Sequence, residues 1–491
     1  MKILDFFKRD KPTAPKRYFQ RNFASAKYDN LFHGWRGTDL SADQELINNL
    51  QVMRNRVRQV CNDDVYARRF LAMCKSNVIG SDGIILQSKA KREDGSFDTV
   101  DIQVIEKAWK KWGEEKRFAS ADRRLNWLDI QRLVIETLAR DGEVFIRMVR
   151  TPDNPFNFSL FIMEGDWFDL KKNEFLNENA VIRMSIEQNG FGEPVAYHQL
   201  QYQPNNNYVT DPFTKPTERV SPDEIIHLYI MERPGQSRGI PWMNTALRGL
   251  EMLHQYHESE LVASRIGSSA MGFFTSQDSQ GYTGVDRDES GNIITEFQPG
   301  TFQQLPDGVK FEPFTPNHPT NAFPTFVKSI LRSISSGLGV SYNALSSDLE
   351  SVNFSSIRAG VMEERIIWQT LQNFMVNNFC RPVFNNWLRM SIASGELQLP
   401  MQKIEKFENV SWVPRGWSYV DPLKEINAHK VAHEMGVESL TDIASSKGKD
   451  LQEIFEKIKR ENELAEQLGI SLPQKEDAVT IAVQEDDDAE I

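Results

Sequence analysis

The stretch that decides the fold runs from Phe323 to Gly395 and reads FPTFVKSILRSISSGLGVSYNALSSDLESVNFSSIRAGVMEERIIWQTLQNFMVNNFCRPVFNNWLRMSIASG. In its first part, Thr325 to Ser336, apolar residues recur at helical spacing. A short polar and acidic segment, Ser346 to Phe354, follows and predicts a loop. From Ser355 onward, apolar residues recur every three or four positions, which predicts a long helix with one buried face.

The second helix of this stretch is long and contains a proline. If it runs from Ser355 to about Ser391, it spans roughly 55 Å, which exceeds the width of a small domain. Because proline lacks an amide hydrogen and clashes with the carbonyl group four residues earlier, we expect a kink at Pro382. Periodicity does not reveal what packs against a helix. Two interpretations therefore remain open, a core helix of a large α+β protein and a part that spans an assembly.

Length and composition are those of a globular protein. The chain has 491 residues, of which 40% are hydrophobic and 26% charged, and its length predicts two to four domains. No run of about 18 apolar residues occurs, so the sequence predicts no membrane span. The three cysteines, Cys61, Cys74 and Cys380, are few and widely spaced. This pattern argues against a disulfide framework and a zinc site, and we expect no cofactor.

The net charge of −12 is unevenly distributed. Residues 1–60 carry twelve Lys and Arg against six Asp and Glu, whereas residues 473–491 carry seven acids and one lysine. An acidic chain is a poor clamp for nucleic acid, because affinity for DNA comes largely from neutralising phosphates. The charge does not exclude a protein past which DNA slides.

The predicted elements change in type along the chain. Residues 1–27 are basic and aperiodic, which indicates a mobile arm, and the acidic residues 471–491 indicate a disordered tail. Helices are predicted near residues 41–60, 65–77, 102–116, 127–139, 422–435 and 450–468. Alternating patterns predict short antiparallel strands at residues 143–149, 158–163, 181–186, 195–201 and 224–231. Pro241 occupies a favoured first position for a further helix, and the Gly- and Pro-rich stretch 273–322 is long enough for a small subdomain.

One short motif could carry chemistry. Gly235 to Gly239 reads GQSRG and fits the G-x-S-x-G pattern of a nucleophile elbow between a predicted strand and a predicted helix. However, three residues separate the strand from the motif, and the upstream strands are predicted to be antiparallel, whereas the elbow belongs to a parallel sheet. A serine hydrolase that uses Ser237 is one hypothesis, and a glycine-rich hinge between domains is the other.

Other candidate catalytic groups point to no reaction. No G-x-x-x-x-G-K-[ST] loop occurs, so the sequence encodes no P-loop ATPase. Asp141 and Glu143 lie near a strand start, and we interpret them as a turn with a solvated acid rather than as a catalytic pair. Two histidine pairs have helical spacing but no evident third metal ligand, so we interpret them as surface or interface residues. These pairs are His254 with His257 and His429 with His433.

Several stretches together are similar to a known family. They are HGWRGTDLSADQELINNLQVMRNRVRQVCNDDVYARRFLAMCKSNVIGSDGIILQ (33–87), ARDGEVFIRMV (139–149), IIHLYIMERPGQSRGIPWM (225–243), ESELVASRIGSSAMGFF (258–274), ISSGLGVSYNALSSDLESVNFSSIRAGVMEERIIWQ (334–369) and RGWSYVDPLKEINAH (415–429). In this order they resemble the portal proteins of tailed bacteriophages, specifically the lambda-like portal family. Several matches in family order are far more specific than a single motif.

The resemblance implies an α+β fold: a portal-type subunit with an α/β wing, a two-helix stem, a small β-containing clip, a long kinked helix and a helical crown. Carried over to this chain, it implies a flexible N-terminal arm (1–27), the wing (28–240), the first stem helix (241–272), the clip (273–322), the second stem helix (323–345), the tunnel loop (346–354), the long kinked helix (355–394), the wing return and crown helices (395–470) and a disordered acidic tail (471–491).

By the same resemblance, the chain is expected to be no enzyme but one subunit of a ring, commonly of twelve, at one vertex of the capsid in the virion. The ring, assembled in the host cytoplasm, is implied to be the head–tail connector and the channel for double-stranded DNA during packaging and ejection. The implied partners are other copies of the chain, the terminase large subunit that supplies the ATPase, the major capsid and scaffold proteins, and the head-completion and tail proteins, with no membrane.

The resemblance implies two kinds of site residue: the residues of the tunnel loop, which lines the DNA channel, and Pro382, where the long helix kinks. It implies no catalytic and no metal-binding residue. The loop residues are Ser346, Ser347, Asp348, Leu349, Glu350, Ser351, Val352 and Asn353. Because the loop has two acids and no Lys or Arg, we expect it to meet DNA sterically and through repulsion. Alternatively, Asp348 and Glu350 cap the helix that begins near Ser355 or pair with Arg358.

Overall fold

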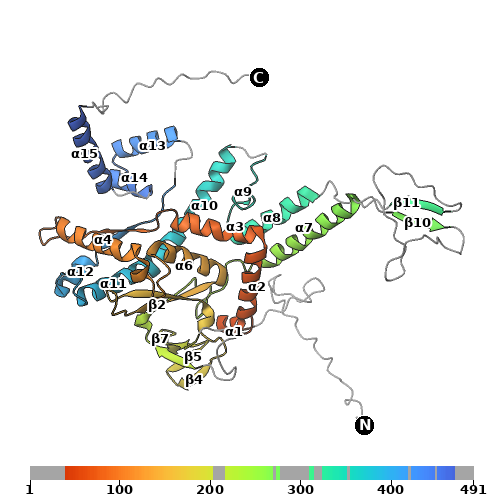
Figure 1. Cartoon of the computed structure of the whole chain (residues 1–491), viewed down its shortest axis with the longest axis horizontal. Helices are drawn as coiled ribbons and strands as arrows, with labels where there is room; N and C mark the ends of the chain where they lie inside the picture. The colour runs from red at the N-terminus through yellow and green to blue at the C-terminus, as the bar shows by residue number, and fades with distance from the viewer. Residues whose placement is uncertain are drawn as a thin grey trace, which may run out of the picture.

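The computed structural model describes residues 39–202, 216–268, 272–276, 309–313, 323–350, 354–417, 422–447 and 451–469 (Figure 1). In these ranges the chain has an α+β fold, as predicted. The predicted arm (1–27), most of the stretch 273–322, the loop residues 351–353 and the predicted tail (471–491) lie outside the described residues.

Helices make up most of the described chain. The α-helices are α1 (Ala42–Ile47), α2 (Leu50–Asp63), α3 (Val65–Cys74), α4 (Thr99–Glu114), α5 (Lys116–Ala119), α6 (Trp127–Asp141), α7 (Leu247–Ser268), α8 (Phe323–Leu338), α9 (Tyr342–Ser346), α10 (Phe354–Met375), α11 (Arg381–Ala393), α12 (Ile404–Phe407), α13 (Pro422–Glu434), α14 (Leu440–Ser446) and α15 (Leu451–Leu468). Two π-helical turns, η2 (Lys75–Ile79) and η5 (Val376–Cys380), continue α3 and α10.

The strands form four antiparallel sheets, which confirms the predicted antiparallel strands upstream of residue 230. A three-stranded sheet has the order β3 (Ser159–Met163), β2 (Glu143–Val149) and β9 (Ile225–Tyr229). A five-stranded sheet contains β4 (Glu174–Asn177), β5 (Ala180–Arg183), β6 (Ile186–Asn189), β7 (Pro194–Leu200) and β8 (Thr217–Val220). Two-stranded sheets pair β1 (Ile85–Ser88) with β12 (Val410–Val413), and β10 (Gly272–Ser276) with β11 (Val309–Pro313).

The helix predicted over residues 41–60 is broken in two. Ser41 caps α1 by accepting a hydrogen bond from the Gln44 amide at 3.3 Å. At the break, the Asn49 side-chain amide donates to the Glu45 carbonyl at 2.8 Å. An asparagine that bonds the backbone locally competes with helix propagation, which explains why α2 begins only at Leu50.

Helices α7 and α8 lie side by side and project from the body of the chain (Figure 1). They run antiparallel: Thr245 donates to the Gly337 carbonyl at 2.9 Å near one end, and the rings of Tyr256 and Phe326 lie 5.2 Å apart near the other. Gly249 permits this close approach, since a Cβ there would lie 3.1 Å from the Ile334 side chain. The prediction that a helix begins at Pro241 is wrong, because residues 241–246 form turns and α7 starts later.

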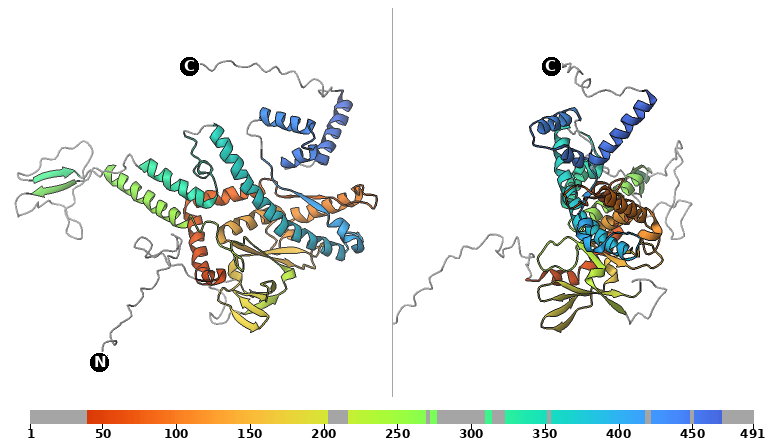
Figure 2. Two further views of the ribbon diagram at one scale, coloured as in Figure 1. Left: turned by 180° about the vertical axis from the view of Figure 1, so that it is seen from behind. Right: turned by 90° about the vertical axis from the view of Figure 1, so that its left-hand side faces the viewer.

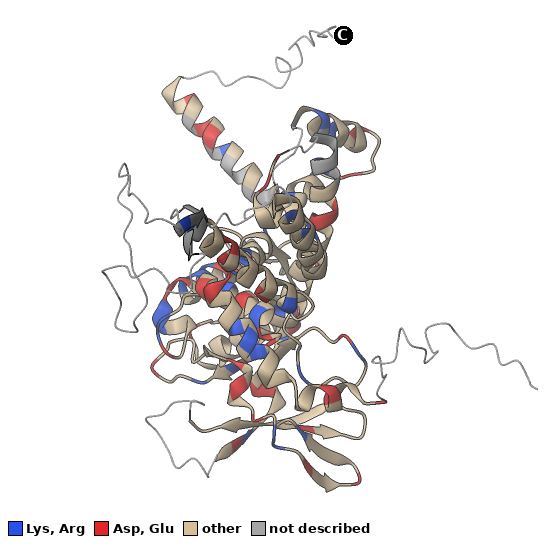
Figure 3. Cartoon of the chain, turned by 90° about the vertical axis from the view of Figure 1, so that its right-hand side faces the viewer, with Lys and Arg blue, Asp and Glu red and all other residues tan. Residues whose placement is uncertain are grey.

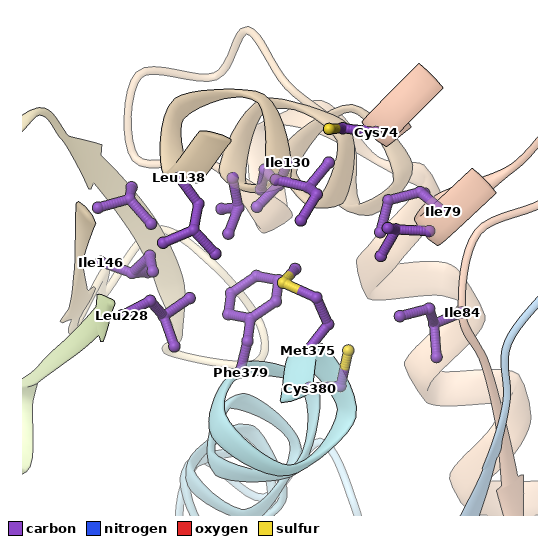
Figure 4. Close-up of a cluster of buried hydrophobic side chains, with 14 of the residues drawn as sticks. Cys74, Ile79, Ile84, Ile130, Leu138, Ile146, Leu228, Met375, Phe379 and Cys380 are labelled. Atoms are coloured by element: carbon purple, nitrogen blue, oxygen red, sulfur yellow. The ribbon is translucent and has the colours of Figure 1, made fainter. Parts of the chain in front are cut away.

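The long helix α10–η5–α11 passes through the main hydrophobic core. In Figure 4 the side chains of Met375 and Phe379 point toward Ile130 and Leu138 of α6, and Ile146 of the three-stranded sheet lies beside them. All five residues are fully buried. The helix therefore has the buried face that its periodicity predicts, and α6 separates it from solvent on one side.

Aromatic side chains form a second part of this core, around Trp109. The ring of Trp109 lies 4.8 Å from that of Trp112, 5.3 Å from Trp127 and 5.0 Å from Trp387. These residues come from α4, α6 and α11, so the cluster fastens the C-terminal half of the long helix to the N-terminal helices.

Helices α13 and α15, predicted near 422–435 and 450–468, are confirmed, and the short α14 between them was not predicted. We call α13–α15 the C-terminal lobe. Figure 2 shows it standing apart from the body. Within the described ranges, none of the helices combines the length and the apolar character that a membrane span requires.

Candidate functional site

The candidate loop follows α9 and is held at its base by three other helices. Ser341 caps α9, and its amide donates to Glu364 of α10 at 3.2 Å. Arg69 of α3 donates to the carbonyl of Ala344 at 3.2 Å. Leu345 is 2% exposed. These contacts fix the last turn before the loop, so the loop leaves the body at a defined position.

Asp348 completes the base of the loop rather than facing solvent freely. It accepts a hydrogen bond from the Tyr342 hydroxyl at 2.6 Å and forms an ion pair with Lys328 of α8 at 3.2 Å. Its other oxygen accepts from the Glu350 amide at 2.9 Å. The Tyr342 hydrogen bond, with help from the Glu350 amide and Lys328, lowers the pKa of Asp348 to about 2. The contact is therefore complete above the ordinary aspartate pKa and is lost only as the pH falls through the lowered value.

The tip of the loop is more open than its base. Ser347 has a left-handed backbone with φ of 56°, which turns the chain away from α9. Leu349 is 69% exposed, and Glu350 is exposed as well. Ser351, Val352 and Asn353 lie outside the described residues. Within the described part of the loop, Glu350 is therefore the acid that can meet a ligand.

Pro382 lies in the second position of α11, directly after the π-turn η5. The residue four positions earlier, Asn378, is inside that turn. Proline offers no amide hydrogen to that carbonyl and its ring crowds it, and a π-turn is one way in which a helix accommodates both effects. The π-turn therefore lies directly before the proline, and the kink at Pro382 stays a prediction.

Replacing Pro382 with alanine restores the missing amide and is expected to convert η5 into regular α-helix. A helix-interior proline costs up to about 3 kcal/mol relative to alanine, so the free energy of unfolding should rise, by less than that amount because the π-turn already compensates. Chemical denaturation measures the gain. Phage yield measures function, which we expect to fall if the predicted bend positions the loop. A regular helix with normal phage yield would contradict the role of the bend.

A buried ion cluster joins the three-stranded sheet to the segment before α7. Glu143, at the start of β2, is fully buried and forms ion pairs with Arg54 of α2 and with Arg238, each at 2.5 Å. It also accepts from the Gly239 amide at 2.9 Å and contacts His227 Nε2 at 3.0 Å. Burial alone raises the pKa of Glu143, but the charges of Arg238 and Arg54 outweigh it and hold the pKa well below its ordinary value.

The cluster continues to Asp141, which is fully buried and bonded by Arg58 at 2.9 Å through two nitrogens. The interpretation of Asp141 and Glu143 as a turn with a solvated acid is therefore wrong. Apart from the neighbouring Arg140, whose Nε donates to Asp141 at 3.2 Å, the partners lie 83 to 95 positions away, so no local pattern contains them. One signal in the sequence could have indicated a buried ion pair: Arg54 lies four residues after Leu50 and three before Val57, on the apolar stripe of α2.

The segment Gly235–Ile240 is a packed joint in which Ser237 is enclosed. Ser237 is 4% exposed, and its hydroxyl donates to Asp43 at 2.6 Å and accepts from the Gln188 side-chain amide at 2.8 Å. Arg238 donates to the carbonyls of Met184 at 2.8 Å and Gly165 at 2.8 Å besides Glu143. These contacts hold the segment in place, which does not fit a flexible hinge. The bonds of the Ser237 hydroxyl go to Asp43 and Gln188 and not to a histidine, and its burial denies access to a substrate.

The described residues contain no group of three or more His, Cys, Asp or Glu side chains arranged to hold a metal ion. Surface hollows occur elsewhere. One of about 820 Å³ lies between η2 and the segment after β12, and is lined by Lys75, Arg132 and Arg415 among others. Arg132 donates to the Gly80 carbonyl at 2.9 Å and Lys75 pairs with Glu136 at 2.9 Å, so these cations already serve the fold.

Comparison with known proteins gives consistent matches. Residues 28–372 match the family model described as phage portal protein, lambda family. The probable portal protein of Halomonas phage phiHAP-1 is 32% identical over 468 residues, which cover 94% of this chain and 90% of that protein. Portal protein B of Escherichia phage lambda is 20% identical over 500 residues, covering 94% of this chain and 93% of that protein. Among solved structures, the neck of an empty GTA particle computed with C6 symmetry has a TM-score of 0.42 and 12% identity, covering 89% of this chain and 95% of that chain.

Portal proteins of this family are structural, non-enzymatic components of the phage head and are part of the virion. The hypothesis of a hydrolase that uses Ser237 is therefore wrong, in agreement with the enclosed position of that side chain. The family model and the relative from phage phiHAP-1 each cover most of the chain. The chain belongs to the lambda family of phage portal proteins.

Proposed function

We propose that copies of this chain form a ring, commonly of twelve, at one capsid vertex, and that double-stranded DNA passes through its central channel during packaging and ejection. The family match over residues 28–372 carries this proposal. In the ring, the terminase large subunit docks during packaging and supplies the ATPase, and the head-completion and tail proteins dock afterwards. The major capsid and scaffold proteins surround the ring, which assembles in the host cytoplasm.

The architecture supports a division of the described residues into parts of such a ring. Residues 28–240 form the wing, α7 and α8 belong to the two stem helices, and β10 and β11 belong to the clip between them. The loop at 346–354 is the tunnel loop, and the kinked helix follows at 355–394. The C-terminal lobe is the crown. The paired and projecting α7 and α8 support this assignment, because they carry the strands β10 and β11 away from the body (Figure 1).

Charge supports a channel that does not retain DNA. The chain carries a net charge of −12, and the coloured ribbon in Figure 3 shows acidic and basic residues interspersed along the body. Repulsion between acidic side chains and phosphates avoids binding sites at which a translocating duplex would stall. Glu350, at the exposed tip of the loop, is the side chain that we place nearest the DNA.

Ring formation is measured most simply as a mass in solution. The purified chain should scatter light with a mass many times 56.5 kDa, and the mass should be independent of concentration once rings have closed. A monomer or dimer under all conditions of salt and concentration would exclude the ring.

The loop is tested by replacing Glu350 with lysine. Asp348 must stay, since a lysine there would face Lys328 and release the base of the loop. Rings of Glu350→Lys should form normally, bind DNA more tightly at low salt, and package it more slowly. Each newly neutralised phosphate adds about one unit to the slope of log affinity against log salt.

The control is Glu178→Lys, which makes the same charge change on an exposed turn between β4 and β5. It should leave the packaging rate unchanged. If intact Glu350→Lys rings package DNA at the wild-type rate, the placement of the loop in the channel is contradicted, but the ring is not.

A further inference from the structure

The described side chains of the C-terminal lobe form almost no hydrophobic core. Among its described side chains, the only buried hydrophobic ones are Ala444 and Ala465. Nine large apolar side chains are exposed by 45–77%. They are Leu423, Ile426, Val431, Met435, Val437, Leu440, Phe455, Ile458 and Leu468. Helices in proteins are stabilised chiefly by burying apolar side chains, and α15, whose apolar residues gather on one side, leaves Phe455 and Ile458 about half exposed, so the lobe needs a further surface to pack against.

The area of this exposed set fits a protein interface. A half-exposed large apolar side chain presents on the order of 100 Å², given that aromatic side chains bury roughly 150–250 Å² in full. Nine of them together present roughly 900 Å², more than the roughly 300–600 Å² of the largest apolar patch on a typical monomer. Divided between two faces, this is about half of the roughly 800 Å² that each partner buries in a standard interface, which is the low end for a specific contact.

Six of the nine exposed residues lie on α13 or α15, and the other three lie between α13 and α14 or at the start of α14. Leu423 and Ile426 are one turn apart on α13, and Phe455 and Ile458 are one turn apart on α15. Figures 1 and 2 place α13 and α15 on two sides of the lobe. The contact between α13 and the following turn is polar, with His429 Nδ1 2.7 Å from a carboxylate oxygen of Glu438. Neither face is therefore covered by the other within one chain.

Two different faces on one subunit are what a head-to-tail ring requires. In such an interface the first face of each copy meets the second face of the next copy, so every face is covered once the ring closes. A single external partner needs only one face. We propose that the α13 face of one subunit packs against the α15 face of its neighbour, so that the C-terminal lobes complete their core only in the ring. This inference rests on the proposed ring.

Cross-linking tests the pairing in the full-length chain. The native cysteines Cys61, Cys74 and Cys380 are buried, so introduced cysteines react selectively. The double variant Ile426→Cys/Ile458→Cys, treated with a short bis-maleimide, should give a ladder of covalent oligomers on a denaturing gel. Each single variant should stay monomeric, because the two faces differ. Rings are counted in the same samples by electron microscopy.

The outcomes separate this inference from the ring itself. Rings without a ladder from the double variant would overturn the pairing and leave the ring intact, as would intramolecular linkage alone. Covalent dimers from a single variant would mean that one face pairs with itself, which contradicts a head-to-tail contact. An absence of rings in the wild type would overturn both the ring and the inference.

Hydrogen exchange supplies a second readout that does not depend on linker reach. Amides of α13 and α15 should exchange at least tenfold more slowly in rings than in unassembled subunits. In rings, Ile458→Asp should abolish this protection, whereas Gln467→Asp, which adds the same charge at an exposed polar position of α15, should not. Equal exchange in rings and subunits would show that the lobes gain no core on assembly.

Discussion

Replacing Glu143 with alanine is expected to lower the free energy of unfolding by about 3–5 kcal/mol, because the change leaves two buried arginines without their carboxylate. Arg54 and Arg238 are both fully buried, and Glu143 holds each of them at 2.5 Å. Neither guanidinium can lose its charge near neutral pH. The loss can be measured by urea denaturation followed by tryptophan fluorescence.

A matched control is Glu174→Ala on the exposed strand β4, which should change stability by no more than about 0.5 kcal/mol. The triple variant Arg54→Met/Glu143→Leu/Arg238→Met should be less destabilised than Glu143→Ala alone, since it removes the charges together. If Glu143→Ala proved as mild as the control, the cluster would not be the joint that we describe.

Replacing Gly142 with alanine is the second change with a large expected effect. Gly142 ends α6 with φ of +84°, and a Cβ there would overlap the carbonyl group of Ile240 and lie 2.5 Å from the Pro241 nitrogen. The left-handed backbone costs an L-residue about 1–2 kcal/mol, and overpacking typically adds 1–3 kcal/mol. We therefore expect a loss of up to about 5 kcal/mol in the free energy of unfolding.

The control for backbone strain alone is Gly192→Ala. Gly192 has a similar φ of +83°, but a Cβ there would have no neighbour within 4 Å. Its cost should be about 1–2 kcal/mol. Equal losses for Gly142→Ala and Gly192→Ala would mean that residues 240–241 move away easily, so the contact between α6 and the segment before α7 would not be rigid.

Local pattern predicted the elements whose own residues determine them. Helix α6 was predicted within two residues of its observed end, because its apolar spacing is regular and Gly142 closes it. The antiparallel strands around β2 were predicted from alternation. The break at Asn49 and the late start of α7 were missed, because they depend on a side-chain hydrogen bond and on packing that periodicity does not contain.

Contacts between distant segments could not be predicted from the sequence. Strand β1 pairs with β12, more than 300 residues later, and no local pattern marks the two as partners. The same holds for Glu143 with Arg238, which lie 95 residues apart. Burial of these charges depends on the tertiary fold, so composition and spacing favoured the wrong, solvated interpretation.

In the candidate loop the acidic composition was predictable, but the roles of its two acids were not. From the sequence, Asp348 and Glu350 receive the same role: both line the channel. In the alternative, they cap the helix that begins near Ser355 or pair with Arg358. The structure separates them: Asp348 binds Lys328 and Tyr342 at the base, and Glu350 stays exposed. Lys328 lies on α8, twenty positions before Asp348, and faces the loop only because α8 and α9 pack together.

The ring hypothesis is tested most directly by electron microscopy of the purified full-length chain. Averages of end-on particles should show closed rings of many subunits around a central hole wide enough for a DNA duplex. Compact monomers or dimers without a hole, at every salt and protein concentration, would contradict the ring and with it the proposed DNA channel.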